Sequence, residues 1–143
     1  MVQSFLFRSA PLFVLALFTL HCEHAGPLEP DPLPEAPTLT DLQTSIFDVS
    51  CAVAGCHVGP NALMGLDLSA GASYENLVNV AGVGSRGLLL VEPGEPDSSY
   101  LVAKIEGSAL IGGSLRMPLG REALSSDQIE AVRAWIEAGA KND

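Results

Sequence analysis

Positive charge is scarce in this chain of 143 residues: seven Lys or Arg residues stand against seventeen Asp or Glu, which gives a net charge of −10 at pH 7. Nucleic acids and anionic lipid surfaces are bound through clustered Lys and Arg side chains. Both are therefore poor partners for this chain. A basic protein would be attracted to it, although the same charge also fits a surface that is merely soluble.

A stretch long enough to cross a bilayer is missing as well. The apolar run at residues 9–20 is shorter than the roughly 20 residues of a transmembrane helix. Because it follows Arg8 near the N-terminus, it is typical of an export signal. We expect residues 1–22 to be a signal peptide and the protein to be exported, as a periplasmic protein or a membrane-anchored lipoprotein. Cys22 is the candidate lipidation site, and an uncleaved N-terminal anchor is the alternative.

Residues 23–38 cannot build a core, because they hold five prolines with acidic residues between them. This composition favours a stiff, extended spacer. We therefore expect a Pro-rich tether, followed by one domain over residues 39–143, an ordinary size for a single core. The membrane would be reached only through an N-terminal lipid anchor.

Helical periodicity in the domain predicts an all-α fold with long loops. A capping-box pattern at Thr40 and Gln43 predicts a first helix over about residues 41–50. Leu42, Ile46 and Val49 follow at helical spacing and form its expected buried face.

A second capping box, at Ser125 and Gln128, predicts the C-terminal helix, which Gly139 ends. Trp135 lies beside the apolar stripe of this helix and is expected to pack on the first helix. The other expected elements are short: helices at 73–78 and after Asp97, loops at 82–87 and 107–120, and a strand-like run at 88–91 that is too short for a sheet.

Cysteine and histidine are also rare, with three residues of each, yet Cys51, Cys56 and His57 lie together directly after the first helix. Two thiols followed by an imidazole suit a c-type haem, which takes two thioether bonds and a proximal iron ligand. The usual spacing is Cys-x-x-Cys-His, whereas four residues separate the cysteines here. Helical positions five apart point in different directions, so we expect the intervening residues to leave the helix.

Two other interpretations compete with covalent attachment of haem c. A Cys51–Cys56 disulfide fits an exported protein and needs the same departure from helix, but it has no use for His57. A structural zinc site needs four ligands, and His21 and His24 precede the domain, which leaves it no second His. The sequence therefore favours haem.

An iron bound by His57 would take its sixth ligand from Met117 or Met64. Pro118 keeps Met117 out of helical geometry, so Met117 can project from its Gly-rich loop. Met64 lies only seven residues after His57, and we expect it in the core or at the rim of the pocket. A gap-filling core position is the alternative for Met117.

At these residues the chain resembles a known family, the small monohaem cytochrome c domains of bacterial envelope proteins of the planctomycete and myxobacterial type. The resemblance implies a cytochrome c-like fold whose first and last helices cross beside the haem. It also implies Cys51 and Cys56 as thioether donors, His57 as proximal ligand and Met117 as distal ligand. The two extra residues between the cysteines depart from the family pattern. The matching stretches run in order through nearly the whole domain: 46–47 and the motif ending at His57, 65–68, 93–101, 116–118 and 129–140.

Few aromatic residues are available to line such a pocket, so we expect aliphatic walls that include Leu66, Leu68, Leu77, Leu101 and Leu115. The resemblance implies an electron carrier and not an enzyme, exchanging single electrons with envelope redox proteins. A non-haem interaction module of the same fold, held by a Cys51–Cys56 disulfide, is the alternative. A peroxidase would need an open sixth iron site, which ligation by Met117 would close.

Overall fold

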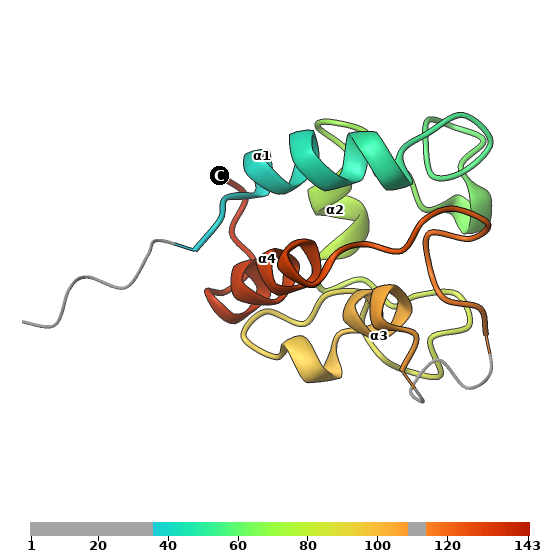
Figure 1. The fold of residues 1–143 in the computed structure, drawn as a ribbon. Coiled ribbons are helices and arrows are strands. Elements are labelled where there is room, and N and C mark those ends of the chain that lie inside the picture. Colours follow the sequence, from blue (N-terminus) through green and yellow to red (C-terminus); the bar gives the residue numbers. More distant parts are fainter. Residues whose placement is uncertain (1–35, 109–113) are drawn as a thin grey trace, which may run out of the picture. The chain divides into compact units, whose positions relative to one another are not determined.

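A computed structural model describes residues 36–108 and 114–143 of the chain. The predicted signal peptide, Cys22 and nearly all of the predicted tether lie outside the described residues. The elements are short helices joined by loops (Figure 1): α1 (Leu39–Leu42), η1 (Gln43–Cys51), η2 (Leu63–Gly65), α2 (Ser73–Leu77), η3 (Pro96–Ser98), α3 (Tyr100–Glu106) and α4 (Ser126–Glu137).

The all-α prediction is confirmed for the part of the chain that the structure describes. Extended pairing there is limited to two isolated bridges, Val78 with Val91 and Ala81 with Leu89. The strand-like run at 88–91 therefore forms no sheet, as expected. In residues 36–108 and 114–143, no helix is both long enough and apolar enough to cross a membrane.

The first helix begins earlier than predicted. Thr38 is its N-cap: the Thr38 hydroxyl accepts from the Asp41 backbone N–H, and the Asp41 side chain accepts from the Thr38 N–H. The predicted box at Thr40 and Gln43 was wrong, because both side chains make long-range bonds instead. The Thr40 hydroxyl donates to the Asp143 carbonyl oxygen at 2.8 Å, and the Gln43 amide group is buried in the domain.

After α1 the chain continues as a π-helix, η1, up to Cys51. Its bonds join residues five apart, which places Leu42 and Phe47 on one face. Both are almost fully buried, whereas Val49 is 56 % exposed. The α-helical spacing that predicted a buried Val49 was therefore wrong at that position, although it placed Leu42 and Ile46 correctly.

The C-terminal helix α4 follows its prediction closely. The Ser125 hydroxyl accepts from the Gln128 backbone N–H, and the Gln128 side chain accepts from the Ser125 N–H. Past the helix, Gly139 adopts a left-handed φ of 99°, a conformation that glycine tolerates at a helix end. Trp135 is buried in the same core as the first helix, and its indole N–H donates to the Lys141 carbonyl oxygen at 2.9 Å.

The helix predicted after Asp97 begins later, with Ser99 as N-cap of α3. Asp97 instead accepts from the Arg133 guanidinium, which also bonds Glu106 at 3.1 Å and so joins η3 and α3 to α4. Val102 and Ile105 of α3 are buried. α2 matches the helix predicted at 73–78 to within one residue.

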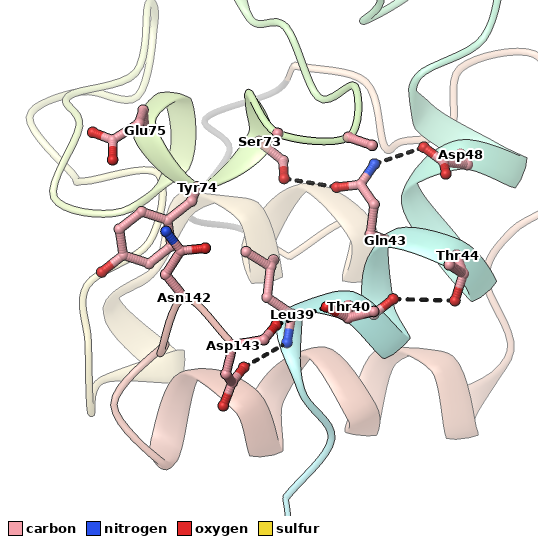
Figure 2. Close-up of a pocket in the computed structure, with 12 residues that line it drawn as sticks. Leu39, Thr40, Gln43, Thr44, Asp48, Ser73, Tyr74, Glu75, Asn142 and Asp143 are labelled. Carbon is pink, nitrogen blue, oxygen red and sulfur yellow. Dashed lines mark hydrogen bonds between the residues drawn. The ribbon is translucent and has the colours of Figure 1, made fainter.

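A single main core joins the two ends of the domain. α4 packs against α1 and α3 (Figure 1). At the start of α1, the Leu39 backbone N–H donates to Asp143 Oδ1 at 2.9 Å (Figure 2). The buried core residues are Leu39, Leu42, Ile46, Phe47, Leu68, Leu77, Val91, Val102, Ile105, Leu124, Val132, Trp135, Ile136 and Ala140.

Candidate functional site

A cavity of about 650 Å³ opens beside the C-terminal end of η1. Its walls come from the end of η1, the segment that follows it, the 80–84 loop, α3 and the segment around Met117. Volumes of about 300–1,000 Å³ are usual for pockets that hold small molecules. Cys51, Cys56, His57 and Met117, which the sequence predicts as site residues, all line this cavity.

The cysteine motif leaves the helix as predicted. Cys51 is the last residue of η1, and Gly55 takes a left-handed φ of 81° in the turn that follows. The chain then closes on itself, because the His57 backbone N–H donates to the Cys51 carbonyl oxygen at 3.1 Å. This closed turn is what brings two sulfurs five residues apart to one cavity.

Both cysteines of this turn are free thiols and half-buried. Burial raises the pKa of the Cys51 thiol from an ordinary value of 9.0 to about 11. The positive charge of Arg121 offsets this rise only in part. Cys51 is therefore held as a neutral thiol at physiological pH, in an environment that disfavours charge.

His57 is half-buried, and its backbone is held on both sides. Its N–H bonds Cys51, and its carbonyl oxygen accepts from the Leu68 N–H at 2.9 Å. The imidazole Nδ1 is buried without a hydrogen-bond partner among the described residues. A buried polar atom of this kind calls for an explanation, because most buried ring nitrogens are paired.

Met117 lines the cavity from a segment that α3 holds. Its backbone N–H donates to the Lys104 carbonyl oxygen at 2.8 Å. The Lys104 ammonium donates to Ser114 Oγ at 3.2 Å and to the Leu115 carbonyl oxygen, which fixes the residues just before Met117. The half-buried Met117 thus reaches the cavity from a non-helical segment, as predicted.

Other predicted pocket residues are mostly in place. Leu66, Leu68, Leu77 and Leu101 line the cavity, and so does Met64. Met64 is 75 % exposed, which places it at the rim, as expected. Leu115 was a wrong prediction: it is 64 % exposed and does not line the cavity, because the bonds to Lys104 use the Leu115 backbone while its side chain faces solvent.

Two cationic residues of the wall were missed by the sequence analysis. Lys104 and Arg121 line the cavity, whereas no Asp or Glu within the described ranges does so. Arg121 also donates to the Val49 carbonyl oxygen at 3.3 Å and ties its loop to η1. The only sequence signal for these residues was the rarity of basic side chains in the chain.

Across residues 36–108 and 114–143, no group of three or more His, Cys, Asp or Glu side chains is placed to hold a metal ion. The cavity is lined by Cys51, Cys56 and His57 and by the Met117 thioether.

A second pocket, of about 370 Å³, lies between α1, η1, α2 and the C-terminal residues (Figure 2). It is partly polar, and Gln43 spans it: Nε2 donates to Asp48 at 2.6 Å, and Oε1 accepts from the Ser73 hydroxyl at 2.7 Å. None of the predicted site residues lines this pocket. The bond from Ser73 joins α2 to η1.

No protein-family model, no curated protein and no solved structure matches this chain.

Proposed function

We propose that this protein is an exported monohaem c-type cytochrome that carries single electrons between envelope redox proteins. The domain would adopt a cytochrome c-like form of its helical fold. The observation that carries the proposal is the larger cavity, where Cys51, Cys56, His57 and Met117 meet although the cysteine pair and Met117 lie some sixty positions apart in the sequence.

The residues of the larger cavity suit a haem in three respects. The cavity walls are mainly aliphatic, which suits a porphyrin face and excludes water. The unpaired, buried Nδ1 of His57 belongs to a residue that reaches the cavity. Lys104 and Arg121 supply positive charge for carboxylate substituents, and no acidic side chain among the described wall residues opposes them.

Cys51 and Cys56 would hold the cofactor covalently. Each thiol would be joined to one vinyl group of the haem by a thioether bond, with the thiol hydrogen taken up by the other vinyl carbon. No oxidant or leaving group is needed.

His57 and Met117 would serve as the two protein ligands of the iron, since both line the cavity. Haem supplies the one-electron redox chemistry, and a methionine ligand favours a higher reduction potential. The aliphatic walls would limit solvent access, which also tunes the potential. In this role the chain needs no general acid, general base or nucleophile, so we propose a carrier and not an enzyme.

The alternative function is a non-haem interaction module held by a Cys51–Cys56 disulfide. One observation favours it: the turn closed by the His57 N–H and the Cys51 carbonyl oxygen brings both thiols to one cavity whether or not haem is attached. His57 would then be replaceable without loss of the fold.

The deciding experiment is a visible spectrum of the full-length protein, expressed with a cytochrome maturation system, followed by haem staining of a denaturing gel. A sharp reduced α-band and haem that survives denaturation are the expected results. The matched control is Cys51→Ala with Cys56→Ala, which should lose covalent haem. A colourless wild-type protein, made beside a cytochrome that matures normally, would reject the proposal in favour of the disulfide module.

A further inference from the structure

We infer that Asp67 is a positioning residue for His57, acting through the backbone of the turn that carries the imidazole. The inference rests on the proposed function for the identity of the bound group. Its basis is a set of hydrogen bonds that converge on one carboxylate oxygen of Asp67.

Asp67 Oδ1 accepts three hydrogen bonds. Two come from the backbone N–H groups of Gly59 and Ser69, both at 3.0 Å, and the third comes from the Ser69 hydroxyl. These bonds hold the pKa of the half-buried Asp67 carboxyl below its ordinary value, with the Ser69 hydroxyl as the largest cause. Donors alone surround this oxygen, so an ionised carboxylate is the group that fits.

These bonds join two segments that lie side by side. Gly59 follows His57 by two residues, and the next residue after Asp67 donates its N–H to the His57 carbonyl oxygen at 2.9 Å. The carboxylate of Asp67 thus takes the place of a backbone acceptor for Gly59. Together the two bonds fix the peptide groups on the C-terminal side of His57.

The segment that carries Asp67 is itself anchored to helices. Gln43 of η1 donates to the Leu68 carbonyl oxygen at 2.9 Å, and this bond is buried. Asn76 of α2 donates to the Asp67 carbonyl oxygen at 3.1 Å. His57 is therefore connected through Asp67 and Leu68 to η1 and α2, in addition to the bond between its own N–H and Cys51 at the end of η1.

These hydrogen bonds matter because a histidine that binds iron must keep its imidazole ring in a defined plane. Groups that orient a metal ligand from outside the coordination shell tune the metal as strongly as some ligands do. A charged acceptor makes hydrogen bonds roughly twice as strong as a neutral one. The negative charge of Asp67, and not only its shape, should therefore hold the turn.

The test compares Asp67→Asn and Asp67→Ala with the wild-type full-length protein. In Asp67→Ala we expect amide hydrogen exchange at Gly59 to accelerate at least about tenfold, the effect of losing a charge-assisted bond. Asp67→Asn should give a smaller acceleration. In haem-loaded protein, the ferric EPR g-values should shift in both variants, because they respond to the ring plane of the axial His.

The matched control is Asp127→Asn, which removes an exposed carboxylate at the start of α4, away from the cavity wall. It should leave Gly59 exchange and the EPR spectrum unchanged. Unchanged Gly59 exchange in Asp67→Ala would overturn the inference. So would faster exchange with unshifted g-values, since Asp67 would then be merely structural.

Failure of the proposed function is a separate result. A colourless protein would reject haem, while the hydrogen exchange of Gly59 and the NMR shifts of the His57 ring protons would still report on Asp67. If those ring signals stay unmoved in Asp67→Ala, Asp67 does not position His57.

Discussion

The Met117 backbone N–H donates to the Lys104 carbonyl oxygen at 2.8 Å, which attaches the segment of the candidate distal ligand to the last turn of α3. The Lys104 side chain adds a second attachment through Ser114 and Leu115. One residue of α3 thus holds the Met117 segment by both its backbone and its side chain. His57 is held separately, through the segment that contains Leu68.

Replacing Met117 by Ala should alter the reduced absorption spectrum of the haem protein and lower its reduction potential, because a thioether ligand raises the potential. Redox titration followed by visible spectroscopy measures both. Met64→Ala is the matched control, since Met64 also lines the cavity but is 75 % exposed. An unchanged spectrum in Met117→Ala would remove this residue from the ligand set.

Replacing Lys104 by Ala should loosen Met117 while keeping the backbone bond. Added imidazole should then displace the methionine more easily, with an apparent affinity for the ferric protein about two- to fivefold higher, as expected for a partly exposed charged contact. Spectroscopic titration with imidazole measures this affinity. The control is Lys141→Ala, outside the cavity wall. Equal affinities in wild type and Lys104→Ala would show that the side chain does not restrain Met117.

The raised pKa of Cys51 predicts slow alkylation in the haem-free, reduced protein. With a pKa of about 11, roughly one thiol in a thousand is ionised at pH 8. The alkylation rate at Cys51, measured in Cys56→Ala by mass spectrometry, should rise about tenfold per pH unit and level off near pH 11. Arg121→Ala should slow it further, because the positive charge of Arg121 lowers this pKa.

The same shift links stability to pH. The thiol pKa is higher in the folded protein than in the unfolded chain, so the folded state keeps its proton longer as pH rises. The contribution of Cys51 to the free energy of unfolding is complete below about pH 9 and decreases as pH rises toward about 11. Alkylation that levels off near the ordinary thiol pKa in folded protein would contradict a buried Cys51.

The π-helical register of η1 can be tested by stability alone. Phe47→Ala should lower the free energy of unfolding by about 3–5 kcal/mol, the usual cost of emptying a large buried site. Val49→Ala should change it by less than about 0.5 kcal/mol, since Val49 is 56 % exposed. Urea unfolding of the two variants measures both. A regular α-helix, with Val49 buried, would give a large loss for Val49→Ala as well.

Local patterns predicted those parts of the fold whose partners lie close in sequence. The Ser125 and Gln128 box is complete within four residues, so the start of α4 could be located from sequence. The start of α1 could not, because Thr40 bonds Asp143 and Gln43 bonds Leu68, and neither partner is visible in a local pattern. The capping box that forms instead, at Thr38 and Asp41, also pairs a threonine with a polar side chain three residues later.

In the candidate site, too, some residues could be identified from the sequence and others could not. The clustering of Cys51, Cys56 and His57 was visible in the sequence, and Pro118 indicated a non-helical Met117. Asp67 and Arg121 were not identified, because their partners Gly59 and Val49 offer backbone groups that every sequence position shares. Side-chain chemistry can be read from sequence, whereas a backbone partner appears only when the chain is folded.

α1 and η1 form one continuous helical run from Leu39 to Cys51. It begins at Leu39, whose backbone N–H bonds Asp143, and it ends at Cys51, which lines the larger cavity. Leu39 and the cavity are thus separated by the length of this helix. The described residues 36–38 thus meet the helical run at the end remote from Cys51 and the larger cavity.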